Sequence, residues 1–299
     1  MNKPAPPHPV SGWLILDKPR GLGSTQGVAA VKRVLRQGGY AKTKVGHGGT
    51  LDPEAEGVLP IALGEATKLA GRMLDASKIY EFTVRFGEET DTLDAAGTVV
   101  ATSNVRPTLA GLKAVLPRFT GAIEQVPPAY SALKVDGKRA YHRARAGEEV
   151  VLSTRAVTVF DLSLLPSANR EELNCATLRA HVSKGTYIRS LARDVAHALG
   201  TVGHVTYLRR TKAGPFRQEQ AISLDMLEKQ AKRASLHNLI LPLEAGLDDI
   251  PAFHLDPDSA QAVRQGRVLS DLPPVREGWA NGLHLATLHS VPVALVEID

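Results

Sequence analysis

The chain combines two periodicities of apolar and polar residues, one typical of strands and one typical of helices. A continuous apolar run at 12–16 predicts a buried strand. Alternating or clustered apolar residues predict further strands at 78–86, 97–101, 119–125, 150–165, 173–182 and 204–210. Helical spacing predicts helices at 64–74, 109–116 and 186–199, and one capped by Ser24 or Thr25 that ends near Gln37. These elements favour an α+β fold with a large sheet.

Breaks in this pattern indicate the domain boundaries. The first nine residues contain four prolines, so we expect a flexible N-terminus at 1–11. The pattern breaks again at 241–243, where Pro242 lies, and the remaining chain is short and acidic. We therefore expect a main domain at 12–245 and a small, β-rich C-terminal domain at 250–299.

Composition narrows the class of protein. Of the 299 residues, 43% are hydrophobic, which supports a packed core. The only cysteine, Cys175, excludes an intrachain disulfide and a zinc site built on a cysteine pair, which favours metal-free chemistry in a reducing compartment. The sequence has no apolar run of the roughly 20 residues that a membrane helix needs, and no apolar signal core. We expect a cytoplasmic protein that contacts neither a metal nor a membrane.

The positive charge is concentrated in the first part of the chain. The net charge is +5, but residues 1–218 hold 30 Lys and Arg against 19 Asp and Glu, whereas residues 219–299 hold 6 against 12. Two windows carry the excess, with five basic residues against Asp136 at 131–145 and eight against Asp194 at 177–217. Such patches are expected to bind a polyanion, although an ordinary solvated basic face would have the same composition.

The densest group of chemically useful residues is the segment GHGGTLDP at 46–53. Its glycines permit positive φ angles and the close approach of another chain, and Pro53 keeps Asp52 out of the α region. This arrangement is typical of a rigid loop that holds a catalytic carboxylate. A glycine turn in which Asp52 is only a capping residue remains the alternative.

Three other residues gain meaning beside Asp52. Arg189 falls in the first turn of a predicted helix, where the helix dipole disfavours a cation, so it needs a carboxylate partner, either Asp52 or Asp194. Tyr80 either stacks on a base or transfers a proton, or it is an ordinary core tyrosine. For His47 the ordinary alternative is a loop histidine that bonds backbone groups.

In combination, these segments resemble the TruB family of tRNA pseudouridine synthases. The family's motifs occur in order between residues 12 and 217, which chance does not produce. They are LDKPRG at 16–21, GHGGTLDPEAEGVLPIALGEATKL at 46–69, KIY at 78–80, TDTLDAAG at 90–97, PPAYSALKVDGKRAYHRAR at 127–145, SKGTYIRSLARDVAHALG at 183–200 and YLRR at 207–210.

The resemblance implies the pseudouridine synthase fold, in which helices flank a mixed, largely antiparallel central sheet and a small PUA-like domain follows. It implies a cofactor-free conversion of uridine to pseudouridine at position 55, in the T-arm loop of tRNA, after the base flips out. Asp52 would act as the nucleophile at the ribose or as the base at its 2′ position, Tyr80 would stack on the base, and Arg189 would complete the catalytic site. The expected substrate-binding residues are His47, Tyr187, Leu208, Lys18, Gly48 and Thr50.

The segment at 124–152 resembles the family's insertion that clamps the RNA hairpin. The expected RNA-binding residues are Lys134, Lys138, Arg139, Arg143, Lys184, Arg209 and Arg210. The expected partner is tRNA, and we expect a monomer that needs no obligatory protein partner. The acidic C-terminal segment departs from the family pattern, so a supporting role competes there with RNA contact.

Two other function classes compete with this interpretation. A non-catalytic RNA-binding protein or tRNA folding chaperone would use the same basic surface, but it would not need Asp52, Tyr80 and Arg189 together. A phosphate-binding or nucleotide-hydrolysing protein would use the glycine-rich loop, but the chain lacks the P-loop motif that such proteins carry after a strand.

Overall fold

The computed structural model describes residues 10–131, 133–135, 137–148, 150, 152–166, 172–232, 236–269 and 282–298. Most of the predicted flexible N-terminus lies outside this part of the chain. Its last two residues are ordered, because Val10 packs in the main core and Ser11 Oγ accepts a hydrogen bond from Glu65 N at 3.0 Å. Residues 10 and 11 therefore pack with the main domain.

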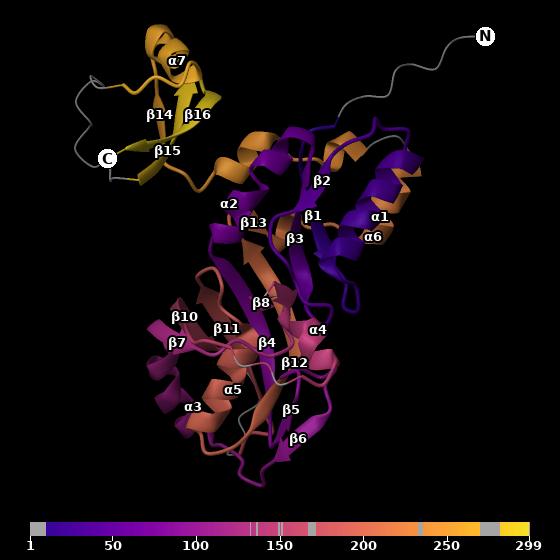
Figure 1. The fold of residues 1–299 in the computed structure, drawn as a ribbon, viewed down its shortest axis with the longest axis vertical. Helices are drawn as coiled ribbons and strands as arrows, with labels where there is room; N and C mark the ends of the chain where they lie inside the picture. The colour runs from indigo at the N-terminus through magenta and orange to yellow at the C-terminus, as the bar shows by residue number, and fades with distance from the viewer. Residues whose placement is uncertain are drawn as a thin grey trace.

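One large sheet runs through the main body (Figure 1). Its strand order is β1-β3-β12-β4-β11-β10-β7, with β2 beside β3 and β13 beside β12. Apart from a short parallel contact between β12 and β3, its neighbouring strands are antiparallel, which confirms the implied architecture. The strands are β1 (Gly12–Lys18), β2 (Val45–His47), β3 (Glu56–Leu63), β4 (Lys78–Phe86), β7 (Gly121–Gln125), β10 (Arg155–Leu164), β11 (Cys175–Val182), β12 (Gly203–Ala213) and β13 (Phe216–Arg217).

Helices cover the two halves of this sheet. Helix α1 (Ser24–Gln37) packs with α6 (Leu224–Lys232) beside β1, and α5 (Ile188–Ala198) packs on β4 and β12. Helix α3 (Leu109–Val115) lies near α5, at the lower end of the body in Figure 1. The loop that contains Asp52 joins β2 to β3 where β3 begins its contact with β12, so it lies between the two halves.

Most predicted elements are present, and the errors have local causes. Strand β4 has the predicted bounds, but the predicted helix at 64–74 is a 3₁₀ helix, Gly64–Lys68, followed by α2 (Ala70–Asp75). Strands β2 and β3 were not predicted, because Gly46, Gly57 and Pro60 give this region the composition of a loop. A separate two-stranded sheet joins β5 (Glu88–Thr90) to β6 (Val99–Thr102).

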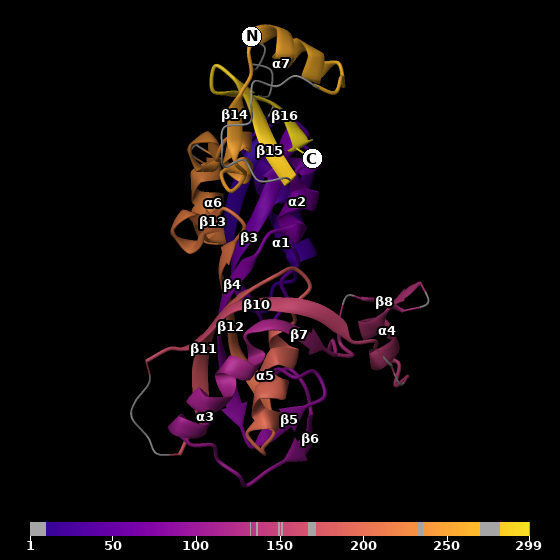
Figure 2. The same ribbon diagram turned by 90° about the vertical axis from the view of Figure 1, so that its left-hand side faces the viewer.

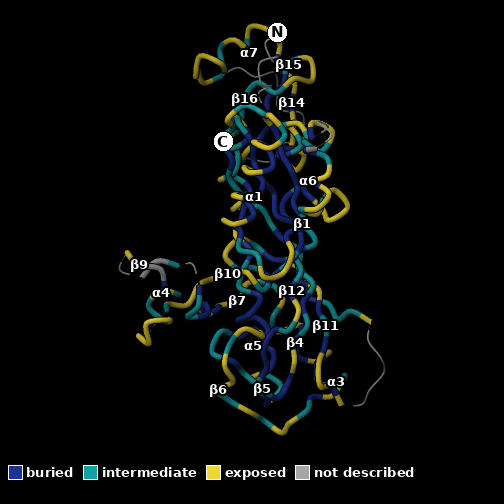
Figure 3. The backbone as a smooth tube through the Cα atoms, turned by 90° about the vertical axis from the view of Figure 1, so that its right-hand side faces the viewer, coloured by how far each residue is buried: buried dark blue, intermediate teal, exposed yellow. Residues whose placement is uncertain are grey.

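Two smaller parts extend from the main body (Figures 1 and 2). Strands β8 (Lys134–Val135) and β9 (Lys138–Arg139) and helix α4 (Ala140–Arg145) form an arm that projects sideways within the predicted insertion. Figure 3 shows that α4 is mostly intermediate or exposed, whereas the large sheet is mostly buried. At the other end, β14 (Ala252–His254), β15 (Gly282–Leu288) and β16 (Val291–Ile298) form a three-stranded sheet beside α7 (Pro257–Arg264), as expected for a β-rich C-terminal unit.

No helix among the described residues is long and apolar enough to cross a membrane. No group of three or more His, Cys, Asp or Glu among them is arranged to hold a metal ion.

Candidate active site

Lys18 supports the loop that carries Asp52. Its side chain is fully buried, and its Nζ donates hydrogen bonds to the carbonyl oxygens of Pro19 (3.0 Å), Leu22 (2.7 Å) and Pro53 (3.4 Å). Burial lowers the pKa of Lys18 to about 8. The ammonium group of Lys18 thus holds the backbone on the C-terminal side of Asp52, and the substrate contact expected for this residue stays a prediction.

Ser24 fixes the backbone on the other side of Asp52. Its hydroxyl donates to Leu51 O at 2.9 Å and accepts from Leu51 N at 2.8 Å, and the side chain is buried. The prediction that Ser24 or Thr25 caps helix α1 is wrong, because Gly23 is the N-cap residue. The hydroxyl is thus free to hold the peptide groups that precede the carboxylate.

The glycines of the loop also have structural partners. Arg210 is buried, and it donates from Nη2 to Gly49 O at 3.1 Å and from Nη1 to Thr50 O at 3.3 Å. A Cβ on Gly48 would lie 2.6 Å from the Cβ of Met73, so only glycine fits there. Arg210 and Gly48 therefore shape the loop, and Arg210 also lines a cavity beside Asp52, while their expected contacts with RNA and substrate stay predictions.

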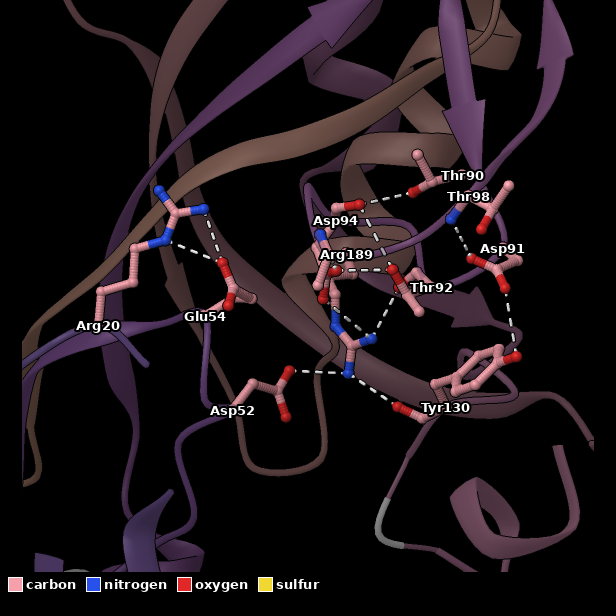
Figure 4. Close-up of polar contacts among 11 residues, drawn as sticks. Arg20, Asp52, Glu54, Thr90, Asp91, Thr92, Asp94, Thr98, Tyr130 and Arg189 are labelled. Carbon is pink, nitrogen blue, oxygen red and sulfur yellow. Dashed lines mark hydrogen bonds and ion pairs between the residues drawn. The ribbon is translucent and has the colours of Figure 1, made fainter. Parts of the chain in front are cut away.

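Arg189 gathers acceptors from three segments (Figure 4). Its Nη2 lies 2.7 Å from Asp52 Oδ2 and donates to Tyr130 O at 3.0 Å, while its Nη1 donates to Thr92 O at 2.7 Å and lies 3.5 Å from Asp94 Oδ2. The Arg189 side chain is only 5% exposed, but that of Asp52 is 39% exposed. A buried cation thus orients a carboxylate that a substrate can reach.

The predicted contact between Arg189 and Asp52 is confirmed. The alternative partner, Asp194, forms its ion pair with Arg193 at 2.8 Å. Arg189 is the second residue of α5, where the helix dipole is unfavourable for a cation. The two carboxylates beside it, Asp52 and Asp94, offset this effect.

The turn before β6 is built to present Asp94. Thr92 Oγ1 donates to Asp94 Oδ1 at 2.6 Å, Ala96 N donates to the same oxygen at 3.1 Å, and Thr90 Oγ1 donates to Asp94 O at 2.7 Å. Leu93 adopts a φ of 61°, in the left-handed region that side chains other than glycine rarely enter. Backbone strain of this kind persists where the surrounding structure fixes it, which here is beside Arg189.

A cavity of about 220 Å³ opens beside Asp52 and Arg189. Tyr80, Tyr187 and Leu208 line it together with Thr50, Asp52, Arg189 and Arg210, so seven of the predicted site residues meet there. Burial raises the pKa of Tyr187, so this phenol resists ionisation. An oriented carboxylate next to mostly apolar and aromatic walls can attack or deprotonate a sugar while a planar ring is held away from water.

Lys78 lies at the edge of the same cavity, although it was not among the residues expected at the site. Its Nζ donates to Leu74 O and Ala76 O, each at 2.6 Å. Burial lowers its pKa to about 8. The cavity therefore has a desolvated cation on the side where α2 ends.

A second cavity, of about 690 Å³, lies on the other side of Asp52. His47, Thr50, Tyr141 and Arg145 line it together with the first turn of α1. Burial lowers the pKa of His47, which favours a neutral ring at physiological pH. The guanidinium group of Arg145 lies 5.8 Å from the centre of the Tyr141 ring, so an exposed cation and an aromatic face border this space.

The other predicted RNA-binding residues differ in how accessible they are. Lys184 is exposed and forms an ion pair with Asp75, and the partly buried Arg143 forms one with Glu148, each at 2.7 Å. Arg209 pairs with two carboxylates, at 3.0 and 3.1 Å, so its charge is already compensated within the protein. The side chains of Lys134, Lys138 and Arg139 lie outside the described part of the structure.

Replacing Ser24 with alanine should slow the reaction at Asp52 more than it weakens substrate binding. Ser24→Ala removes two buried hydrogen bonds and leaves Leu51 N and O unpaired, at a cost of about 1–3 kcal/mol in stability. A loosened carboxylate should lower kcat about tenfold, whereas KM should change little.

Steady-state kinetics and thermal unfolding measure these two effects. Ser223→Ala is the matched control, because Ser223 also lies at a helix start, where it accepts a hydrogen bond from Met226 N. A kcat that equals that of the parent would show that Ser24 does not position Asp52.

Sequence reasoning missed several residues of the site. Asp94, Thr92 and Tyr130 contact Arg189, and all three lie in motifs that the sequence offered without a role. The signal available for Asp94 was a carboxylate in a turn of Thr, Asp and Gly residues, which is equally typical of any turn. Thr92 and Tyr130 contact Arg189 through backbone carbonyl groups, so the identity of their side chains does not predict these contacts.

Comparison with known families accounts for most of the chain. The model of the TruB family pseudouridylate synthase N-terminal domain matches residues 33–188. The model of the tRNA pseudouridylate synthase B C-terminal domain matches residues 189–248. All of the contacts of Arg189 given above lie within these two segments, and none of them involves the unit that follows residue 250.

Individual relatives extend the likeness to nearly the whole chain. A tRNA pseudouridine synthase B of Novosphingobium aromaticivorans is 66% identical over 97% of this chain and 94% of its own length. The protein of the same name from Zymomonas mobilis is 54% identical over 99% of this chain and 94% of its own. Among solved structures, a chain of a Cbf5-Nop10-Gar1 complex is similar with a TM-score of 0.70 and 28% identity, over 96% of this chain and 78% of that one. A chain of an H/ACA RNP bound to a substrate RNA is similar with a TM-score of 0.68 and 25% identity, over 96% and 77%.

Proposed function

This chain belongs to the TruB family of pseudouridylate synthases, and on that premise we propose that it converts uridine 55, in the T-arm loop of tRNA, to pseudouridine. The observation that carries the proposal is the ion pair between Asp52 and Arg189 at the edge of a cavity that Tyr80 lines. The name shared by the relatives from Novosphingobium and Zymomonas supports tRNA as the substrate.

The reaction is an isomerisation, so every atom of the substrate is retained except for exchange of one proton. The bond between N1 of uracil and C1′ of ribose breaks, the ring turns, and a new bond forms between C5 and C1′. The proton on C5 then leaves, and N1 gains a proton. Asp52 starts the reaction, either by attack on C1′ or by removal of the 2′ proton, and both routes need the oriented carboxylate that Arg189 provides.

The walls of the smaller cavity suit the detached ring. Tyr80 stacks on the uracil and assists in removal of the C5 proton. Tyr187 and Leu208 keep the ring near the ribose and exclude water, which would otherwise capture the ribose. Tyr187 contributes as a neutral phenol, because burial raises its pKa.

The larger cavity provides the path of the RNA strand that flanks the flipped base. Flipping costs a few kcal/mol, which contacts to the extruded strand must offset. Arg145 is placed for a phosphate and Tyr141 for a base, while His47 occupies the space that the uracil leaves. Every residue assigned to the site belongs to one chain, so the enzyme acts as a monomer. It acts in the cytoplasm, where tRNA is its substrate.

Binding of tRNA should weaken steeply as salt increases, because the contacts release counterions from phosphates. A plot of log affinity against log salt concentration should have a clearly negative slope, and Arg145→Ala should reduce its magnitude by about one. Filter binding at several salt concentrations measures the slope. Lys113→Ala, which removes an exposed cation from α3, is the control, and a flat salt response would contradict this role for the basic residues.

The substrate is tested by release of tritium from C5 of uridine in a synthetic T-arm hairpin. We expect release of one equivalent per hairpin, because only the target uridine loses its C5 proton. The same hairpin with cytidine at the target position should release none, although its other uridines remain. Equal release from both hairpins, or from neither, would contradict the proposed substrate.

A further inference from the structure

The root of the insertion runs along the first turn of α5, which carries Arg189. Tyr187 N donates to Gln125 Oε1 at 2.8 Å, and Ser190 Oγ donates to Val126 O at 2.7 Å. Gln125 is buried, at 2% exposure. The segment that enters the insertion is therefore fixed to the same helical turn as the active-site arginine.

Tyr130 follows in the same segment and makes two contacts with the site (Figure 4). Its carbonyl accepts from Arg189 Nη2 at 3.0 Å, and its hydroxyl donates to Asp91 Oδ2 at 3.2 Å. The other oxygen of Asp91 accepts from Thr98 N at 2.8 Å, which anchors the carboxylate in the turn before β6.

These contacts close a ring around the guanidinium group. Asp91 precedes Thr92, whose carbonyl accepts from Arg189 Nη1 at 2.7 Å. The hydroxyl of Tyr130 therefore ties together two of the backbone segments that orient Arg189. Loss of this bond would remove the direct hydrogen bond between the segment of Tyr130 and the turn of Asp91.

The insertion beyond Tyr130 also borders the RNA path. Tyr141 and Arg145 on α4 line the larger cavity beside Asp52, and Tyr130 lines it too. Tyr141 N donates to Ser131 O at 3.1 Å, so α4 is bonded to the residue that follows Tyr130. A shift of α4 is thus transmitted to Tyr130 through one hydrogen bond and one peptide bond.

We propose that Tyr130 is a positioning residue that couples RNA binding by the insertion to the alignment of Arg189 with Asp52. The inference rests on the proposed roles of Asp52, Arg189 and the insertion. RNA seated against α4 holds Tyr130 in place, and the bond from Tyr130 to Asp91 keeps the acceptors of Arg189 in register. A shift of α4 on RNA binding therefore changes how firmly Arg189 holds the carboxylate of Asp52.

Tyr130→Phe separates this role from base stacking, because it keeps the ring and removes only the bond to Asp91. Single-turnover reactions with excess enzyme give the rate at saturating tRNA and the enzyme concentration at half-saturation. We expect the saturating rate to fall fivefold to tenfold, about the effect of one hydrogen bond, with half-saturation within about twofold of the parent. In an Asp91→Ala background, Tyr130→Phe should change the rate by less than about twofold, because the shared bond is already absent.

Three outcomes would overturn the coupling. They are an unchanged saturating rate, an effect confined to half-saturation, and a double variant whose loss is the product of the single losses. Tyr40→Phe, which removes the hydroxyl of a tyrosine after the end of α1, controls for general effects, and thermal unfolding checks the fold of each variant. Asp52→Ala is measured alongside: activity in that variant contradicts the proposed function, whereas an inactive Asp52→Ala with a fully active Tyr130→Phe contradicts only the coupling.

Discussion

Asp52→Ala should abolish pseudouridine formation, with a loss of at least about a thousandfold, while tRNA affinity stays within about threefold of the parent. The carboxylate starts the reaction by either route, and among the described residues Asp52 is the only carboxylate that lines the smaller cavity. Affinity survives because contacts to phosphates, which Asp52 does not make, supply most of the binding. Single-turnover rates and filter binding measure the two quantities.

The fold should tolerate this change. The side chain of Asp52 is partly exposed, and Arg189 retains Asp94 and two carbonyl groups as partners. Asp225→Ala is the matched control, since Asp225 is an exposed aspartate in the first turn of α6. Turnover by Asp52→Ala at the parent's rate would remove the catalytic assignment.

Arg189→Ala should cost both activity and stability. It leaves the buried Asp94 without its ion-pair partner, and loss of one member of a buried pair destabilises a fold by about 3 kcal/mol. It also frees the carboxylate of Asp52 from its orienting contact, so the saturating rate should fall at least about a hundredfold. Denaturant unfolding and single-turnover kinetics measure these effects separately.

Arg189→Lys distinguishes charge from geometry. Lysine keeps the positive charge, but a single ammonium group cannot reach acceptors in three segments as the guanidinium fork does. We expect it to recover most of the stability and little of the rate. A lysine variant with the rate of the parent would show that Arg189 supplies charge alone.

The sequence predicted the elements in which the pattern of apolar and polar residues matches the pattern of burial. The alternation of Lys78–Phe86 reproduces the bounds of β4, because successive side chains of a strand point to opposite faces of the sheet. Strand β3 escaped prediction, because its glycine and proline are typical of loops, although its residues are almost all buried. Ser24 was misassigned as a cap because a serine before a helix has that role in most proteins.

Part of the site was also predictable from the sequence. The pair of Asp52 and Arg189 followed from one unfavourable position, a cation in the first turn of a helix. The burial of Lys18 and Arg210 did not follow, because a basic residue near a predicted active site has the same sequence signature whether it contacts RNA or backbone carbonyls. Only the folded structure shows that backbone carbonyls lie within hydrogen-bonding distance of these two side chains.

The most direct test of the account maps pseudouridine along a tRNA transcript after incubation with the purified protein. The account predicts one new pseudouridine, at position 55 in the T-arm loop, and none after incubation with Asp52→Ala. An unmodified position 55, or modification by the Asp52→Ala variant, would contradict it.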